Sequence, residues 1–283
     1  MSVEVPPLFA GLCDDAAVFP PGNLPLADAV PAHAQHRAAA YAPMVGAFVL
    51  AAKDLEGLAS LVASLAPRSF RLSLTVPLRQ VAAAVGYVDA LAAAQLESVE
   101  VALPDDARPA EVVPSLERAL GDRSVPVFVE LPRDERRAKL VDALLGTGLM
   151  AKLRTGGVRA DLYPDESELA AAVASLAAAG VPFKATAGLH HAVRNTDRQT
   201  GFEQHGFLNL LTASGAVLDG AGVDELANLL ADRDGTRVAD RVRTLPAEVR
   251  DTFRSFGTCS ITEPVEELAG LGLIDTRLTE NLA

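Results

Sequence analysis

Six short apolar runs recur from position 44 onward, and a helix-forming stretch follows each of them. The runs are MVGAFVL, FRLSLTV, SVEVAL, VPVFVEL, LMAKLRT and VPFKAT. Their spacing of about 25 to 30 residues is the length of a β-strand plus a crossover helix. The pattern therefore predicts a parallel sheet built from successive βα units.

The stretches between the runs carry helix signals, with Pro, Asp or Ser near several starts and glycines such as Gly146 and Gly180 at the ends. We expect helices over 54–65, 79–95, 109–120, 134–145 and 166–179. The last quarter is less regular, with helices predicted over 206–218, 223–231 and 263–270 and a closing strand in FRSFGTCS. No seventh strand is recognisable in the pattern.

We expect a single domain in which residues 44–283 form the barrel. Residues 1–43 contain a loop with the segment DDAAVFPPG and a helix predicted from Leu26 to Tyr41. That segment is expected to plug or flank the barrel. A polar stretch after Thr186, GLHHAVRNTDRQTGFEQHG, is too long for an ordinary connection and is predicted to act as a lid.

One-sided polarity within the runs favours a closed barrel over an open sheet. A doubly wound nucleotide-binding sheet normally has a G-x-G-x-x-G turn, and none is present. Successive side chains of a strand point to opposite faces, and one face of most runs is apolar. The alternating polar residues are Arg71, Ser73, Thr75, Glu100, Glu130, Lys152, Arg154, Lys184 and Thr186. Because strands covered on both faces would be apolar on both, the pattern predicts a (β/α)8-type, TIM-like barrel with a polar lumen, irregular in its last quarter.

The charged residues near the C-terminal ends of these strands lie where barrel active sites are found. Lys152, Arg154 and Lys184 outnumber Glu130 there, and unpaired buried charge is strongly disfavoured. We therefore expect an anionic ligand, a phosphate or carboxylate. The guanidinium of Arg154 suits bidentate binding of an anion. The following Thr155, Gly156 and Gly157 offer a hydroxyl and backbone N–H groups to the same ligand.

The same rim permits Schiff-base chemistry. A lysine crowded by cations has its neutral form favoured, so that Lys184 or Lys152 could attack a carbonyl group. Glu130 is then a candidate proton carrier, as are His190 and His191 in the predicted lid. Thr186, two residues beyond Lys184, is placed to orient a substrate hydroxyl.

Two short motifs resemble those of deoxyribose-phosphate aldolases. KATAG at 184–188 resembles the KTSTG motif of that family, and KLRTGGVR at 152–159 is similar to its K-x-x-GG-[IV]-R motif. The resemblance implies a lyase in which Lys184 forms the Schiff base, Lys152 perturbs it, and Gly156 and Gly157 bind phosphate. The two motifs stand in the opposite order in this chain.

Other segments add candidate ligand contacts. CDDAAVFPPG at 13–22 is similar to the GDDAAV segment of thiamine-monophosphate kinases, in which the aspartates bind magnesium with ATP. An acidic pair in a proline-rich loop also suits a pocket mouth, so Asp14 and Asp15 are expected there as ligand or substrate contacts. In FGTCSITEP, Thr258 and Ser260 are expected to bind ligand, whereas Cys259 is more typical of a small buried hydrophobe than of a nucleophile.

Three alternatives stay open at this stage. The lysines form a structural ion-pair network with Glu130 or Glu100; the barrel is an isomerase or phosphoribosyl-type transferase that uses its cations only to hold phosphate; or the chain is a non-catalytic binding protein. The five histidines fall in two segments that match no established metal motif, so we predict no metal and no cofactor.

Bulk composition limits the partners. A formal net charge of −12 opposes binding to nucleic acid or acidic membranes, which leaves a small anionic substrate as the expected ligand. Two cysteines provide no disulfide framework. The start MSVEVPPLFAGL has neither a basic region nor a long apolar run, which favours a cytoplasmic location. A homo-oligomer is compatible with the sequence.

Overall fold

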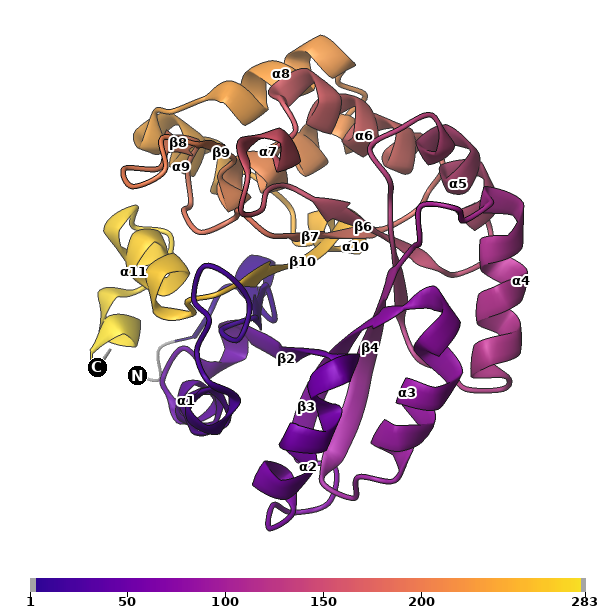
Figure 1. Cartoon of the computed structure of the whole chain (residues 1–283). Coiled ribbons are helices and arrows are strands. Elements are labelled where there is room, and N and C mark those ends of the chain that lie inside the picture. Colours follow the sequence, from indigo (N-terminus) through magenta and orange to yellow (C-terminus); the bar gives the residue numbers. More distant parts are fainter. Residues whose placement is uncertain (1–3, 281–283) are drawn as a thin grey trace.

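Eight parallel strands close into a barrel in the computed structural model of the chain, which describes residues 4–280 (Figure 1). This arrangement confirms the predicted (β/α)8-type barrel. In their order around the barrel the strands are β1 (Cys13–Asp15), β10 (Phe253–Thr258), β7 (Phe183–Thr186), β6 (Met150–Arg154), β5 (Val127–Glu130), β4 (Ala94–Ala102), β3 (Phe70–Pro77) and β2 (Val45–Ala51).

Strand β1 is the one that the sequence pattern did not reveal. Cys13 pairs with Phe256 of β10 on one side and with Val45 of β2 on the other, so β1 joins the last strand to the second. Three residues are too few to show a two-residue periodicity. The segment 1–43, predicted to plug or flank the barrel, therefore also supplies one of its wall strands.

The predicted helices of the first five units are present and lie outside the strands (Figure 1). They are α2 (Leu55–Val62), α3 (Val81–Asp89), α4 (Pro109–Leu120), α5 (Arg136–Leu144) and α6 (Glu166–Ala178), and α1 (Leu26–Ala38) precedes them. The last quarter holds α7 (Phe207–Leu218), α8 (Val223–Ala231), α9 (Gly235–Val242), α10 (Val249–Thr252) and α11 (Thr262–Gly270), of which α9 and α10 were not predicted. Short 3-10 turns occupy Pro7–Phe9, Ala42–Met44, Ala52–Asp54, Leu78–Gln80, Ala160–Leu162 and Thr276–Thr279.

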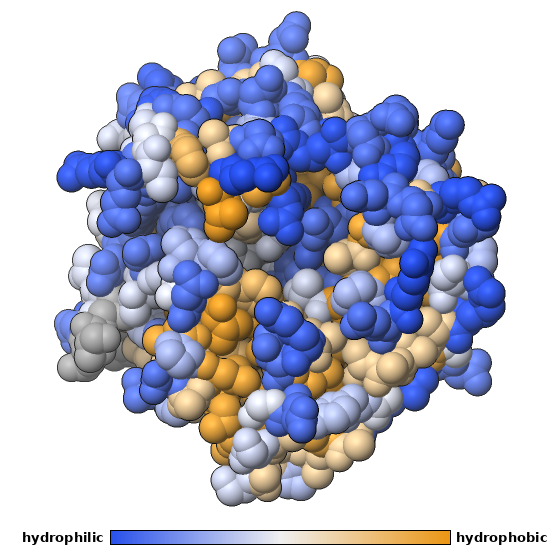
Figure 2. Space-filling model, in the orientation of Figure 1, coloured by the Kyte–Doolittle hydropathy of each residue, from blue (hydrophilic) through white to orange (hydrophobic). Residues whose placement is uncertain are grey.

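The apolar core lies between the strands and the surrounding helices. Aromatic rings stack within it: Phe183 and Phe253 have centroids 5.3 Å apart, and Phe207 and Phe256 lie at 4.7 Å. Such pairs add to the stabilisation from buried area. Figure 2 shows a largely hydrophilic surface on one side of the molecule, with hydrophobic residues gathered in the region of α1, α2 and β3.

The polar stretch predicted as a lid leaves the barrel after β7. It contains a two-stranded antiparallel pair, β8 (Asn195–Thr196) and β9 (Glu203–Gln204). The buried Asn209 on α7 anchors its base, because its Oδ1 accepts a 2.8 Å hydrogen bond from the Arg194 N–H while its Nδ2 donates to the carbonyls of Leu229 and Asp232. The stretch is thus tied to the last-quarter helices.

Within residues 4–280, no helix combines the length and the apolar character needed to cross a membrane.

Substitution of Gly46 in β2 tests how closely β1 and β2 pack. A Cβ atom at this position would lie 2.1 Å from Oδ1 of Asp14, so the Gly46→Ala variant must displace that buried carboxylate. We expect a loss of about 1–3 kcal/mol in the free energy of unfolding, measured by urea denaturation.

Gly86 in α3 provides the matched control, because a Cβ atom there meets nothing within 4 Å. Gly86→Ala should stabilise the protein by up to about 1 kcal/mol, as alanine favours a helix over glycine. Equal stability of the two variants would contradict the tight packing of β2 on Asp14.

Candidate active site

Strand register sets three charged side chains at one level inside the barrel. Glu130 of β5 pairs with Lys152 of β6, and Lys152 pairs with Lys184 of β7. The ammonium of Lys184 lies 2.7 Å from Oδ2 of Asp14 on β1 and 2.6 Å from Oε1 of Glu100 on β4. Since β1 and β4 are not neighbours of each other, Lys184 links opposite walls across the lumen.

Lys152 continues the chain of charges toward the rim. Its Nζ lies 3.2 Å from Oε2 of Glu100 and 2.9 Å from Oε2 of Glu130, whose Oε1 is 3.2 Å from Nε of Arg154. Cations and carboxylates therefore alternate in the order Asp14, Lys184, Glu100, Lys152, Glu130 and Arg154. We call these six residues the lumen network.

The expected excess of positive charge is wrong, because Asp14 and Glu100 join Glu130 and balance the three cations. The sequence pattern placed Glu100 in the lumen but gave no reason to bring Asp14 there. Neutral donors complete the set: the Ser255 hydroxyl donates to Asp14 Oδ2 at 2.6 Å, and the Ser73 hydroxyl donates to Glu100 Oε1 at 2.7 Å. Buried charges satisfied in this way do not require an anionic ligand.

The electrostatics of the network favour its charged form. Burial raises the pKa of Glu100, but the positive charges of Lys184 and Lys152 outweigh that effect and hold the pKa well below its usual value. Burial lowers the pKa of Lys184, yet the charges of Asp14 and Glu100 outweigh it and raise that pKa above its usual value. The expectation that crowding by cations would favour neutral Lys184 is therefore wrong for this arrangement.

A cavity of about 180 Å³ opens above the network at the C-terminal ends of the strands, and we call it the inner chamber. Glu100, Lys152, Arg154 and Thr186 line it, whereas Lys184 does not. Its other lining residues are Ala16, Phe19, Pro20, Val49, Thr75, Gly157, Val158, Leu162, Ala187, His190, Gly257 and Cys259. The rim predicted to hold the site does carry a cavity. Of the lysines within residues 4–280, Lys152 is the one that lines it.

A second cavity of about 400 Å³, the outer chamber, adjoins the first under the predicted lid. The two chambers share six lining residues, which are Pro20, Gly157, Val158, Ala187, His190 and Cys259. The outer chamber is further lined by Pro21, Tyr163, Gly188, His191, Asp197, Gln199, Thr200, Phe202, Gln204 and Glu263. The stretch that follows β7 thus forms one wall of the outer chamber.

His190 and Cys259 lie together where the chambers meet, with Nδ1 and Sγ 3.3 Å apart. Burial, with a smaller effect of His191, lowers the pKa of His190, and burial raises the pKa of Cys259 to about 11. Both side chains are therefore neutral near pH 7. His191 differs, because its hydrogen bond to Glu267 at 2.6 Å raises its pKa, and it lines only the outer chamber.

The side chains of the two adjacent aspartates of β1 point to opposite sides of the strand. Asp14 points to the lumen and Lys184, whereas Oδ2 of Asp15 lies 2.9 Å from Nδ1 of His33 on α1, outside the barrel. Neither lines the chambers, although both were expected at the pocket mouth. Asp15 instead fixes α1 to the barrel wall.

Several other predicted contacts also lie away from the chamber lining. The Thr155 hydroxyl donates to the Ala187 carbonyl at 2.6 Å, and the Thr258 hydroxyl donates to the Ser260 carbonyl at 2.9 Å. Gly156 is packed so tightly that a Cβ atom would lie 2.5 Å from the Tyr163 ring, which gives a structural reason for glycine at this position.

Two loop residues of the chamber walls were not expected there: Phe19 belongs to the segment 13–22, which was singled out for its aspartates, and Leu162 carried no sequence signal. Phe19 follows β1 and Leu162 lies in a 3-10 turn after β6, yet both line the inner chamber. Ser255, by contrast, belongs to the predicted closing strand, and its lumen contact follows from the position of β10 between β1 and β7.

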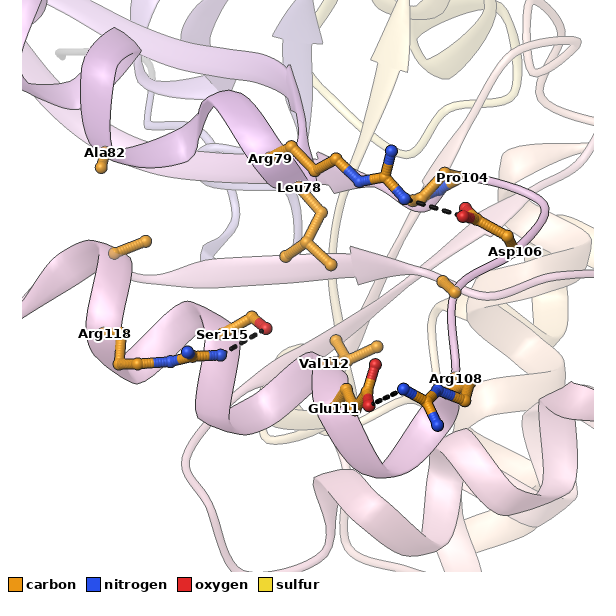
Figure 3. A pocket seen from close by; sticks show the side chains of 12 residues that line it. Leu78, Arg79, Ala82, Pro104, Asp106, Arg108, Glu111, Val112, Ser115 and Arg118 are labelled. Atoms are coloured by element: carbon orange, nitrogen blue, oxygen red, sulfur yellow. Dashed lines mark hydrogen bonds and ion pairs between the residues drawn. The ribbon is translucent and has the colours of Figure 1, made fainter.

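A cavity of about 540 Å³, larger than either chamber, lies outside the barrel between α3 and α4 (Figure 3). Its arginines have local partners: Arg79 pairs with Asp106 at 2.7 Å, Arg108 pairs with Glu111, and Arg118 donates to the Ser115 hydroxyl at 3.2 Å. These exposed pairs contribute little energy. The groove shares no residue with the lumen network, so size alone does not identify the site.

Among residues 4–280, no group of three or more His, Cys, Asp or Glu side chains is arranged to hold a metal ion. No protein-family model matches the chain, and no curated protein matches it significantly. The fold and the site together define a parallel β/α barrel with a charge-balanced lumen and a two-chambered mouth. Since such barrels host many chemistries, function has to be argued from the site.

Removing Lys184 tests the lumen network. Lys184→Met leaves Asp14 and Glu100 without their shared cation, and breaking a buried pair in this way costs about 3–5 kcal/mol. We expect that loss in the free energy of unfolding at pH 7, measured by chemical denaturation.

The pH dependence should also change. Glu100 has a depressed pKa in the folded wild type, so its contribution to stability is present above its ordinary pKa of 4.5 and is lost as the pH falls through the lower folded value. In Lys184→Met, one of the two positive charges that offset the burial of ionised Glu100 is missing, so the pKa of Glu100 rises. Protonation of Glu100 at low pH then removes the unfavourable buried charge. The stability gap between the two proteins should therefore narrow below about pH 5, and a gap that widens there would contradict the assigned charges.

Proposed function

We propose that this chain is a Schiff-base-forming barrel enzyme, a lyase of the aldolase kind that acts on a small carbonyl compound carrying a carboxylate or phosphate. The observation that supports it best is the position of Lys152. Its amine lies at the floor of the inner chamber, within hydrogen-bond distance of two carboxylates, Glu100 and Glu130.

Lys152, rather than Lys184, is the nucleophile in this proposal. The motif resemblance to deoxyribose-phosphate aldolases assigns the opposite roles. Both lysines contact two carboxylates, but Lys152 lines the inner chamber whereas Lys184 lines neither chamber. Lys184 is therefore a positioning residue. Its charge keeps Glu100 ionised and holds that carboxylate beside the Lys152 amine.

Proton transfer accompanies each covalent step. Lys152 first gives a proton to Glu130, whose Oε2 lies 2.9 Å from its Nζ, while Glu100 stays ionised, and the neutral amine then bonds to the carbonyl carbon of the substrate. Loss of water from this adduct takes the proton back with the departing hydroxide and leaves an iminium ion. Since the iminium restores the positive charge of Lys152, the same two carboxylates stabilise it.

The iminium accepts the electron pair of the carbon–carbon bond that breaks, and the proton of the β-hydroxyl group needs an acceptor. His190 is neutral near pH 7 and lines both chambers, so it suits this role. With its Nδ1 next to Cys259, its Nε2 is the nitrogen left for proton exchange.

Arg154 supplies the anion site. Among the described residues its guanidinium has one ion-pair partner, Glu130 through Nε, and the side chain lines the inner chamber. The remaining N–H groups suit a carboxylate or phosphate on the substrate. Thr186 and Gly157 line the same chamber.

The same anion site supports a second candidate function, a phosphate-binding isomerase or phosphoribosyl-type transferase without a covalent lysine intermediate. The charge balance of the lumen network would also suit a non-catalytic binding protein. Both alternatives predict that no lysine reacts with a carbonyl compound.

Borohydride reduction separates these alternatives. The chain contains four lysines, at positions 53, 139, 152 and 184, so peptide mass mapping can assign an adduct. Incubation with pyruvate or dihydroxyacetone phosphate followed by borohydride should convert the imine into a stable secondary amine on Lys152. The Lys152→Met variant should lose this labelling.

Lys53→Met and Lys139→Met are the matched controls, because both side chains are exposed on the outside of the protein, and they should label as the wild type does. Labelling of Lys184 instead would reverse the roles proposed here. Absence of any adduct with either probe would leave the non-covalent alternatives.

Arg154→Met tests the anion site separately. Loss of a charge-assisted contact worth about 1.5–3 kcal/mol should raise the pyruvate concentration for half-maximal labelling by about 10- to 100-fold. Acetone, which has the ketone but no carboxylate, serves as the control probe, and its labelling should change little. Equal effects on both probes would show that Arg154 acts on the lysine and not on the anion.

A further inference from the structure

The outer chamber has a chemistry of its own, and its interpretation rests on the proposed function. We infer that it binds the hydroxyl-rich part of the substrate, so that the full substrate is a keto acid or ketone phosphate with a polyhydroxylated chain. The carbonyl and the anion occupy the inner chamber, and the chain extends under the lid.

The charge of the outer chamber differs from that of the inner one. No lysine or arginine is among its described lining residues, which include Asp197, Glu263, Gln199 and Gln204. His191, whose pKa is raised, also lines it, but its Nδ1 is already paired with Glu267. Carboxylates and amides offer many acceptors, which suit hydroxyl groups and oppose a second phosphate. Tyr163 and Phe202 add an apolar face, with ring centroids 5.6 Å apart.

Gln204 points to a ligand independently of this composition. Its side chain is 5% exposed, lines the outer chamber, and its Oε1 is buried without a hydrogen-bond partner within residues 4–280. A buried amide oxygen left unpaired costs about 1–3 kcal/mol. Because this oxygen has almost no accessible surface, a ligand hydroxyl in the outer chamber satisfies the amide once the amide turns about its last side-chain bond. A hydroxyl both donates and accepts, so it pairs with the amide in either orientation.

The two volumes fit such a substrate. The inner chamber holds about six waters at ~30 Å³ each, which is enough for a small keto-acid head group. The outer chamber, at about 400 Å³, has room for a chain of several hydroxylated carbons. His190 lies at the boundary, so the β-hydroxyl whose proton it takes would be the first hydroxyl of that chain.

Bond cleavage at this boundary gives a balanced reaction. The carbon–carbon bond breaks, its electron pair forms the enamine on Lys152, and the β-hydroxyl proton passes to His190 while its oxygen becomes an aldehyde. Protonation of the enamine and addition of water then release the small keto compound. The aldehyde leaves from the outer chamber with its hydroxyl groups.

Ribitol tests the chamber without Schiff-base chemistry, because it has hydroxyl groups but no carbonyl. Saturation-transfer NMR on the wild-type protein should show ribitol binding, and Gln204→Leu should weaken it by about tenfold through loss of the amide contact. Ser115→Ala, in the groove of Figure 3, is the control and should leave the binding unchanged. Melting temperatures check that each variant is folded.

Glu263→Gln separates a polyol site from a cation site, since its carboxylate makes no side-chain hydrogen bond or ion pair with the described residues. Glutamine keeps an acceptor oxygen for hydroxyl groups, so Glu263→Gln should weaken ribitol binding less than Gln204→Leu does. Stronger binding of putrescine than of ribitol, lost in Glu263→Gln, would overturn the inference in favour of an amine ligand.

The results for ribitol and for borohydride labelling are independent. Labelling of Lys152 without ribitol binding would reject the polyol site and keep the lyase, whereas ribitol binding sensitive to Gln204→Leu without any labelling would do the reverse. Ribitol binding that is unaffected by Gln204→Leu would also reject the site.

Discussion

The ion pairs of Lys184 across the lumen are the constraint on which the rest of the site depends. One ammonium group ties a carboxylate of β1 to a carboxylate of β4, and its burial is tolerated because both partners and their serine donors are in place. Glu100 shares its second oxygen with Lys152 and so connects the closed interior to the inner chamber. Alternating charge thereby places a lysine at the floor of the cavity without leaving any charge of the network unpaired.

The alternation of apolar and polar residues within each strand was enough to predict most of the barrel strands and the polar lumen. Strand periodicity revealed six strands, FRSFGTCS suggested the closing one, and the charged faces of β6 and β7 placed Lys152, Arg154 and Lys184 near the rim. Strand β1 could not be predicted, because its three residues are too few to show the two-residue periodicity of a strand. Its contact with Lys184 joins positions 170 residues apart, and no local rule predicts such a pairing.

The roles within the site needed three-dimensional information. Lys152 and Lys184 look equivalent in the sequence, since each is a lumen-facing residue on a neighbouring strand at the same register. The partners across the barrel make the difference: Asp14 reaches Lys184 and leaves Lys152 to the chamber. The pair Asp14 and Asp15 shows the same limit, because strand alternation sends one side chain to the lumen and the other to His33.

The position of β1 has a consequence for how the chain folds as it is synthesised. This strand is made first among the eight, yet one of its two neighbours is β10, which begins at Phe253. Until that late segment leaves the ribosome, the other strands form at most an open, curved sheet with an exposed edge on each side. Ser255, a donor to Asp14, arrives with the same segment. The barrel wall therefore closes and its buried polar contacts are completed in the same late step. This step follows the synthesis of β1 by about 240 residues.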